Sequence, residues 1–299
     1  MLRITLEQWR MFLAVVKFGG FNQASQGIHK SQSSIHTAVH KIEDSLGVKL
    51  FNVEGRKTVL TQTGELMLRR AKFLVEEAER VESIGVNLGE GIETRLRVAV
   101  DEVFPQQLLY NVLDTVSAEF PYLRIEIMES VLGGATELLK NSDVDIAVAP
   151  FTVNGLFHEE LCQIEFLAVA SPSHPLCQSS EAVPLEKLKS HRQIVVRDSA
   201  ISERKDEGWL EAQQRWTVTH MRTSVDMIEN GFGFAWLPLP LIEEKLKKGK
   251  LKQIPLEINS KRNAQLHLLF NDADSLGPVA RTFLGELRYQ SLNLPTSEQ

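Results

Sequence analysis

Residues 12–65 have the sequence FLAVVKFGGFNQASQGIHKSQSSIHTAVHKIEDSLGVKLFNVEGRKTVLTQTGE, and this stretch determines the fold expected for the N-terminal part of the chain. From Trp9, apolar residues follow at i+3, i+4 and i+7, which predicts an amphipathic helix over residues 6–18. A short helical segment over residues 22–29 follows, and then a longer helix that begins near Ser31 and is ended by a glycine. Two short helices joined by a tight turn are typical of a helix-turn-helix unit.

A β-hairpin is predicted directly after these helices. Two β-prone runs, VKLF at residues 48–51 and TVLT at residues 58–61, surround a turn that contains Gly55. Arg56 and Lys57 are expected at or near the tip of this wing. Two cations in that position are placed to contact the phosphate backbone of a nucleic acid.

Charge is distributed unevenly along the chain. The 299 residues carry a net charge of −6, from 33 basic and 39 acidic side chains. Residues 1–63 hold eight Lys or Arg and four Asp or Glu, which gives +4, and the remainder holds 25 and 35, which gives −10. A small basic part on a large acidic body indicates that one domain contacts a polyanion and the other does not.

The composition excludes several other classes of protein. Hydrophobic residues make up 43% and charged residues 24% of the chain, as in an ordinary globular protein. The longest apolar run, at residues 232–242, is 11 residues long and contains two prolines, so no membrane span is expected. Cys162 and Cys177 are too few for a disulfide framework and lack the spacing of a metal site, which favours a reduced, cytoplasmic location and no bound metal.

A long helix without proline is predicted from Gly64 to about Leu88. Its apolar residues follow a heptad spacing, which favours pairing with a second copy of the chain. The candidate dimerisation residues are Met67, Ala71, Leu74, Ala78, Val81 and Leu88. The alternative is a surface helix that packs on its own domain. Gly89 and Gly91 mark a hinge after this helix.

The rest of the chain alternates strand and helix. Strands are expected at 96–100, 124–128, 144–149, 165–170, 194–196, 234–237 and 266–270, and helices at 106–120, 136–141, 203–215, 224–230 and 278–291. This order predicts a parallel sheet with helices on both faces, in two α/β lobes formed by residues 91–164 plus 266–299 and by residues 165–265. Small ligands bind in the cleft between such halves.

The N-terminal sequence resembles the winged helix-turn-helix of LysR-type transcriptional regulators. The resemblance is carried by the Gly-Gly-Phe turn at residues 19–21, the Ser31-Gln32 start of the long helix, and Leu46-Gly47-Val48 with Leu50-Phe51. Gly55-Arg56, Leu60-Thr61 and Gly64-Glu65 follow at family spacing, and Val-Asp-Ile-Ala at residues 144–147 is similar to a landmark of the C-terminal half.

This resemblance implies a bacterial, cytoplasmic regulator of transcription that binds specific double-stranded DNA. Its fold would be an N-terminal all-α winged helix-turn-helix (residues 1–63), a linker helix for dimerisation (residues 64–90) and a C-terminal two-lobed α/β domain like that of periplasmic binding proteins (residues 91–299). A small-molecule effector in the cleft would modulate operator binding or bending. The implied partners are DNA, the effector, a second chain, a homotetramer of two dimers, and RNA polymerase.

The polar face of the long helix that begins near Ser31 supplies the residues expected to contact bases and phosphates. The candidate DNA-binding residues are Gln32, Ser33, Ser34, His36, Thr37 and His40 for bases, and Lys30, Lys41, Arg56 and Lys57 for phosphates. The alternative is a merely solvated helix face. The family usually has proline where this chain has Ser33, Ser-Arg where it has His36-Thr37, and arginine where it has Val53, so the operator preference is expected to differ.

The effector site is expected at the ends of strands and the starts of helices, where exposed N–H groups attract anions. The candidate effector-binding residues are Asp101, Glu102, Val103, Phe104, Ser130, Arg197, Asp198, Thr223 and Ser224. Asp101 and Glu102 oppose an anionic ligand and favour one with an amine or several hydroxyls. The alternative is that these two acids cap a helix.

No pattern of an enzyme is present in the sequence. It contains no nucleophile elbow, Walker loop or His-Glu-x-x-His, and no cofactor is implied. Gly231-Phe232-Gly233 precedes a predicted strand rather than a helix, so it is not a dinucleotide-binding fingerprint. A secreted small-molecule binding protein would share the two-lobed body, but it would begin with a signal peptide instead of a basic winged unit.

Overall fold

The computed structural model of the chain forms two compact units, Met1–Glu90 and Gly91–Gln299. The structure describes residues 3–54, 57–89, 91–178, 181–208, 210–257, 261–272, 276–292 and 294. Each unit has its own hydrophobic core. None of the helices in these ranges is both long and apolar enough to cross a bilayer.

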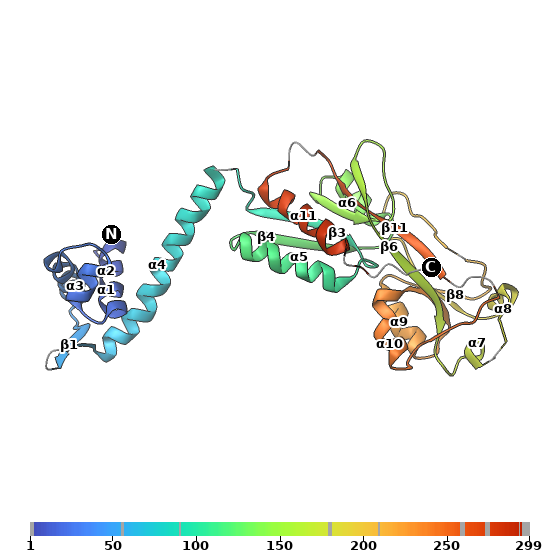
Figure 1. The fold of residues 1–299 in the computed structure, drawn as a ribbon, viewed down its shortest axis with the longest axis horizontal. Helices are drawn as coiled ribbons and strands as arrows, with labels where there is room; N and C mark the ends of the chain where they lie inside the picture. Colours follow the sequence, from blue (N-terminus) through green and yellow to red (C-terminus); the bar gives the residue numbers. More distant parts are fainter. Residues whose placement is uncertain are drawn as a thin grey trace. The chain divides into compact units, whose positions relative to one another are not determined.

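The N-terminal unit contains the predicted helices and a hairpin (Figure 1), but the first strand of the hairpin is Phe51–Glu54 and not the predicted residues 48–51. Its elements are α1 (Leu6–Phe18), α2 (Phe21–Gly27), α3 (Gln32–Leu46), β1 (Phe51–Glu54), β2 (Lys57–Leu60) and α4 (Gln62–Gly89). Thr5 caps α1, because its side chain accepts the N–H of Gln8 while the Gln8 side chain accepts the N–H of Thr5. Gly19 ends α1 in the left-handed conformation with φ 79°, which glycine adopts without steric cost.

A buried glutamate connects α3 to the wing. Glu43 is only 4% exposed, and its Oε1 accepts the N–H of Leu50 at 2.8 Å. Its Oε2 accepts from Nζ of Lys49 at 2.9 Å. Burial acts to raise the pKa of the Glu43 carboxyl, but hydrogen bonds from Leu50, Lys49 and Phe51 together lower it below its usual value. The carboxylate therefore stays ionised and holds the start of the wing against the helix.

The C-terminal unit is built on one mixed sheet. Along its first half the elements are β3 (Arg95–Asp101), α5 (Gln106–Glu119), β4 (Arg124–Ser130), α6 (Gly134–Lys140), β5 (Ile146–Ala149), β6 (Phe157–Ala170), α7 (Pro175–Gln178) and α8 (Leu185–Lys189). They are followed by β7 (Gln193–Val196), β8 (Arg215–Val218), α9 (Met221–Glu229), β9 (Phe234–Pro238), α10 (Leu239–Lys247), β10 (Lys252–Gln253), β11 (Lys261–Phe270) and α11 (Pro278–Leu292).

The sheet has the order β4-β3-β5-β11-β6-β9-β7-β8, with β10 paired to β6. β3 runs parallel to β4 and β5, and β7 runs parallel to β8 and β9, as predicted. At the centre the prediction of a parallel sheet is wrong, because β6 and β11 pair antiparallel to each other along residues 157–167 and 261–270. These two strands join the parallel halves: β11 also pairs with β5, and β6 also pairs with β9.

Helices cover both faces of the sheet, as the strand–helix order predicted. On β3, Val98 and Val100 are in the cluster that contains side chains of α5 and α11, which lie side by side in Figure 1. Ala99 is in the cluster that contains Ala135 and Leu139 of α6. Since successive side chains of a strand point to opposite faces, α6 lies on the other side of β3 from α5 and α11.

The helix predicted over residues 203–215 is wrong. The structure has no helix in the described parts of this segment, and Arg215 begins strand β8 instead. The N–H of Ser202 donates to the carboxylate of Glu137 at 2.8 Å, and the N–H of Lys205 donates to that of Asp198 at 2.8 Å. These backbone donors are thus bound by side chains rather than by carbonyls one helical turn earlier.

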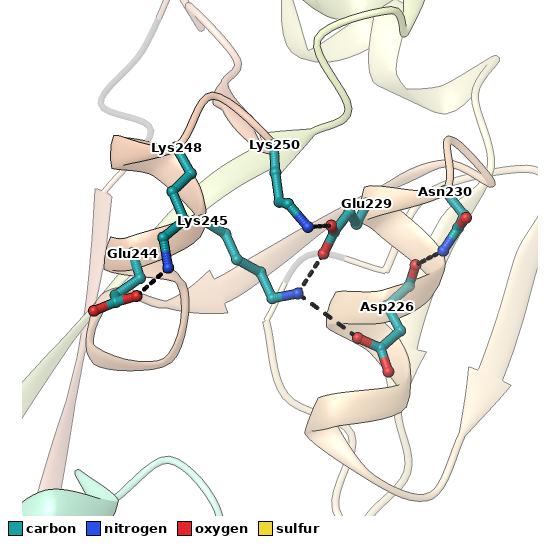
Figure 2. Close-up of polar contacts among 7 residues, drawn as sticks. All are labelled: Asp226, Glu229, Asn230, Glu244, Lys245, Lys248 and Lys250. Carbon is teal, nitrogen blue, oxygen red and sulfur yellow. Dashed lines mark hydrogen bonds and ion pairs between the residues drawn. The ribbon is translucent and has the colours of Figure 1, made fainter.

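A group of ion pairs fixes the C-terminal end of α9 to α10 and the residues after it (Figure 2). The Glu229 carboxylate accepts from Lys245 and, at 2.7 Å, from Lys250, and Lys245 also lies 3.8 Å from Asp226. The two ammonium groups lower the pKa of Glu229 to about 2. The opposite end of α9 is therefore held in a defined position, which matters because that end lines a cavity.

β3 ends at a buried acid that holds the following loops. Asp101 is 2% exposed, and its carboxylate accepts the N–H of Val103 at 3.1 Å and that of Leu132 at 2.7 Å. Burial raises the pKa of Asp101 to about 7, and the charges of Glu102 and Asp198 act in the same direction.

We expect Glu43→Ala to open the junction between α3 and the wing. The buried N–H of Leu50 would lose its acceptor, at a cost of about 1–3 kcal/mol. Hydrogen exchange of the Leu50 amide, measured by mass spectrometry on the full chain, should therefore speed up. Asp44→Ala, at the exposed neighbouring position, is the control. Unchanged protection in Glu43→Ala would contradict this role.

We expect Asp101 to make the chain less stable as the pH rises from about 4 to about 7. Its pKa is about 7 in the folded chain and 3.8 as a free side chain, so the folded state binds the proton more strongly between these values. The loss of unfolding free energy is at most about 1.4 kcal/mol per pH unit. Above pH 7 this contribution is constant.

Asp101→Asn removes the titration, and any change in hydrogen bonding from the amide is independent of pH. The difference in unfolding free energy between Asp101→Asn and the wild type should therefore shift in favour of the variant between pH 5 and pH 7. Urea unfolding followed by tryptophan fluorescence measures it. Parallel pH profiles of the two proteins would show that Asp101 does not titrate in this range.

Candidate functional site

The first turns of α3 expose the polar side chains predicted to contact bases. Gln32 and Thr37 are exposed, whereas Ile35, Val39 and Ile42 are buried in the core of the unit. Two of the candidates also take part in the helix cap: the Ser31 hydroxyl lies 3.0 Å from that of Ser33 and 2.7 Å from that of Ser34.

His36 and His40 have packing contacts in addition to their exposed edges. The His36 ring is half-buried and stacks on Phe21 of α2, with 3.8 Å between ring centroids and an interplanar angle of 10°. Nδ1 of His40 lies 3.2 Å from the Glu43 carboxylate. His36 thus holds α2 against α3, which fixes the angle between the two helices.

The side chains predicted to contact phosphate differ in whether they already form an ion pair within the chain. Lys30 pairs with Glu7 at 3.4 Å. Lys41 is exposed and has no ion pair within the part of the chain that the structure describes. Arg56 and the side chain of Lys57 lie outside the described residues; Lys57 is the first residue of β2.

The α4 residues predicted to form a dimer seam divide into two groups. Ala71 is 2% exposed and Met67 packs beside it, both against the core of their own unit, so these two are used within the chain. The exposed apolar side chains of α4 are Leu66, Phe73, Leu74, Val81 and Val86. At 3.6 residues per turn, Leu66, Phe73, Leu74 and Val81 share one side of the helix, which we name the α4 stripe. Ala78 is half-buried, and the side chain of Leu88 lies outside the described residues.

The C-terminal unit contains a cavity of about 370 Å³ between the two parallel parts of its sheet, which are β4-β3-β5 and β9-β7-β8. It is lined by Asp101, Val103, Val131, Leu132, Pro150, Phe151, Phe166, Gln193, Ile194, Val195, Val196, Glu207, Gly208, Met221, Ser224, Trp236, Arg262, Asn263, Ala264 and Gln265. On one side the lining comes from the end of β3 and the loops after β3, β4 and β5. On the other side it comes from β6, β7, β9, β11, the loop after β7 and the start of α9. This is the position predicted for a ligand cleft.

The predicted effector residues are not all in this cavity. Asp101, Val103 and Ser224 line it. Glu102 and Thr223 line a neighbouring cavity of about 250 Å³, and Phe104 belongs to the core beside a third, smaller one. Ser130 is buried and Arg197 is exposed, and neither lines the main cavity.

Asp198 has a structural position rather than a place in the cavity lining. Its Oδ1 accepts the N–H groups of Gly133, at 3.0 Å, and Ala200, at 2.8 Å, and its Oδ2 accepts that of Lys205. Because these three backbone N–H groups already donate to the Asp198 carboxylate, it holds loops in place instead of facing a ligand.

The two acids at the end of β3 have different roles. Glu102 does cap a helix, but the helix is α9, more than a hundred residues further along the chain. Its carboxylate accepts the N–H of Met221 at 2.5 Å and lies 2.7 Å from Nδ1 of His220. Asp101 holds loop N–H groups and lines the cavity with a pKa of about 7, so neither acid places a fully ionised carboxylate freely in the cavity.

The sequence analysis did not identify Arg262, a charged residue in the cavity wall. Arg262 lies on β11, with its guanidinium carbon 4.4 Å from the centroid of the Trp236 ring on β9. Burial lowers the pKa of Arg262 from its ordinary value. The strand was predicted only from residue 266, so Arg262 was not placed in it; polar and apolar residues alternate from Asn263 to Leu268, but Lys261 and Arg262 lie before this alternation.

Comparison with known families supports both units. The family model described as "Bacterial regulatory helix-turn-helix protein, lysR family" matches residues 6–65, and the one described as "LysR substrate binding domain" matches residues 89–291. The probable HTH-type transcriptional regulator YhaJ of Escherichia coli (strain K12) is 28% identical over 263 residues, which are 86% of this chain and 88% of that protein.

Solved structures have the same fold over nearly the whole chain. CrgA, a LysR-type transcriptional regulator from Neisseria meningitidis, is 21% identical with a TM-score of 0.55, over 96% of this chain and 99% of that one. LysG from Corynebacterium glutamicum, solved with bound effector Arg, is 17% identical with a TM-score of 0.53, over 97% and 98%. The proteins matched are regulators and not enzymes. Since the substrate-binding model alone covers more than half of the chain, this protein belongs to the LysR family of transcriptional regulators, with a helix-turn-helix DNA-binding unit and an effector-binding α/β unit.

Proposed function

We propose that this regulator binds its operator through α3 and the wing, and that a small molecule in the 370 Å³ cavity changes the affinity or the bend of the bound DNA. Residues 1–63 would be the DNA-binding domain, 64–90 the dimerisation helix and 91–299 the effector domain, in the cytoplasm. The observation that carries the DNA contact is the division of α3 into a buried apolar face and an exposed polar face that includes Gln32, Thr37 and Lys41.

The wing and α3 are coupled in a way that suits this role. Glu43 on α3 holds the backbone of Leu50 at the start of the wing, and His36 holds α2 by stacking on Phe21. A recognition helix needs neighbours in fixed positions, because contacts of these neighbours with phosphates set the register at which its side chains reach base edges.

Dimerisation in this proposal uses the α4 stripe of Leu66, Phe73, Leu74 and Val81. Leu74 is 46% and Val81 is 64% exposed, and exposed apolar side chains in a helical row favour pairing with another helix. One half-site offers few base contacts, so a twofold pair of α3 helices would give the required specificity.

The effector would act by bringing the two parallel parts of the sheet closer together around the cavity. Glu102 and Asp198 already tie them together through Met221 and Gly133. A ligand between these parts changes the equilibrium only if its affinity for the two arrangements differs. The proposal includes the association of two dimers into a tetramer and a contact with RNA polymerase, through which altered DNA bending would change transcription. Full-length LysG, solved with its bound effector Arg, is a precedent for an effector in this fold.

We expect two kinds of loss when the α3 face is altered. Gln32→Ala should weaken binding to a duplex selected by the full chain from a random library by about tenfold or more, because a side-chain contact to a base edge is worth about 1–3 kcal/mol. It should leave binding to unselected duplex nearly unchanged. Lys41→Ala should weaken both and reduce the salt dependence of log K by about one contact. Lys140→Ala, on α6, is the control for charge. Equal losses on both duplexes for Gln32→Ala would contradict base contact.

We expect Val81→Glu and Leu74→Glu to convert the dimer to a monomer and to lose selective operator binding. A buried, unpaired carboxylate at a helix pair is costly. Val86→Glu is the matched control, because Val86 is 60% exposed on the same helix but on a different side from Val81. Sedimentation and gel shift measure the two properties. A dimeric Val81→Glu variant with wild-type affinity would place the dimer interface elsewhere.

A further inference from the structure

Arg262 is a charge without a protein counter-charge inside a largely apolar cavity. Its side chain is half-buried and lines the cavity, yet it makes no hydrogen bond or ion pair with any residue in the described ranges. Its guanidinium stacks on the face of Trp236. A cation removed from water in this way is costly unless an anion or hydrogen-bond acceptors reach it.

The acids of the cavity do not neutralise Arg262. The Asp101 carboxylate is bound by the N–H groups of Val103 and Leu132. Glu207, at the rim, is exposed to solvent and forms no ion pair with a described residue. Water solvates the exposed carboxylate of Glu207, so this acid needs no counter-charge. The half-buried guanidinium of Arg262 has lost part of its hydration, so an anion near it would be stabilising.

The surroundings of Arg262 combine this cation with apolar walls. Arg262 lies opposite Phe166 in the antiparallel pairing of β11 and β6, so the two side chains are on one face of the sheet. Ile194 and Met221 line the same cavity. Nη1 of Arg262 lies 3.2 Å from where a Cβ on Gly208 would be, so glycine at 208 leaves room for the guanidinium.

A second polar group in the cavity also lacks a partner. Ser224 lies in α9, is completely buried and lines the cavity, and its Oγ has no hydrogen-bond partner among the described residues. A buried hydroxyl without a partner costs free energy, and a bound ligand atom in the cavity would supply the partner.

From this arrangement we propose that the cavity binds a small organic acid, with its anionic group on the Arg262 guanidinium, its apolar body against Phe166, Ile194 and Met221, and a polar atom on the Ser224 hydroxyl. The guanidinium presents donors in a fork that matches a carboxylate. This inference rests on the proposed role of the cavity as the effector site. It departs from the amine or polyhydroxyl ligand expected from Asp101-Glu102, because Glu102 is outside this cavity and Asp101 is bound by backbone donors.

The test compares matched ligands that differ only in the group expected on Arg262. The full chain is titrated by calorimetry with 3-phenylpropionate, indole-3-acetate and 4-methylpentanoate, and with the primary amide and the primary amine of the same carbon skeletons. We expect at least one acid to bind at least tenfold more tightly than its amide, and its amine not to bind. If no acid binds, or if an amine binds more tightly than its acid, the proposal is wrong.

Substitutions then separate ligand contact from stability. Arg262→Gln should weaken the acid at least tenfold without changing the affinity of the amide, and Arg262→Lys should restore part of the loss. Arg192→Gln is a matched control: Arg192 also stacks on a tryptophan, 3.8 Å from the Trp216 ring, but does not line the cavity. Equal acid binding by the wild type and Arg262→Gln would overturn the proposal.

The proposed contact of Ser224 with the ligand is tested with a matched control. Ser224→Ala should leave the stability of the unliganded chain unchanged or raise it, because it removes an unpartnered hydroxyl, and it should weaken the acid several-fold. Ser291→Ala removes another buried hydroxyl without a described partner, on α11 and outside the cavity lining, and should not affect the acid. Acid binding that Ser224→Ala leaves unchanged would exclude the serine contact.

Gel shifts of the same proteins keep the two proposals apart. DNA binding without ligand tests the proposed operator contact, whatever the calorimetry shows. An acid that binds but leaves DNA affinity and bending unchanged in the wild type would show that the cavity is an acid site without the effector role. An acid that changes DNA binding in the wild type and not in Arg262→Gln would support both.

Discussion

The antiparallel pairing of β6 and β11 is the constraint on which the C-terminal unit depends. These strands are long enough to pair with each other over residues 157–167 and 261–270 and also to extend the parallel strands on either side, through β5 and β9. Because the chain passes between the two parallel parts only along such strands, the ends of β3 and the start of α9 face each other across one cavity. Glu102, directly after β3, then accepts the N–H of Met221 in the other part, and the position of α9 is fixed at its far end by Lys245 and Lys250 on Glu229 (Figure 2).

Much of the fold was predictable because its signals are local. The helix period from Trp9, the glycine after Phe18 and the serine before Gln32 give α1 and α3 their bounds within a residue or two. The predictions failed where long-range contacts override local pattern. A helix was predicted over residues 203–215, but the N–H of Ser202, just before this segment, is held by the distant Glu137, and the N–H of Lys205 is held by the side chain of Asp198. α10 was not predicted; Pro238 is its N-cap residue and Pro240 lies in its first turn, where no hydrogen-bond donor is needed.

The candidate site was less predictable than the fold, and for a related reason. The arrangement of the two parallel parts of the sheet decides which residues at the strand ends line the cavity. Local sequence patterns do not contain that long-range geometry. Of the residues predicted for the effector site, Asp101, Val103 and Ser224 line the cavity, whereas the carboxylates of Glu102 and Asp198 bind backbone N–H groups outside it. Arg262 lies in a part of β11 that its composition did not mark as a strand. In α4 the heptad spacing located apolar residues but not their partners: Ala71 faces its own unit, and Val81 is exposed.

The central claim is that α3 of two chains enters the grooves of one duplex. A hydroxyl-radical footprint of the full chain on a duplex that it has selected tests this most directly. The account predicts two protected patches related by a dyad and separated by about 34–36 Å along the helix axis, or a multiple of it, with wing contacts flanking each. A single patch, or protection that does not depend on sequence, would contradict it.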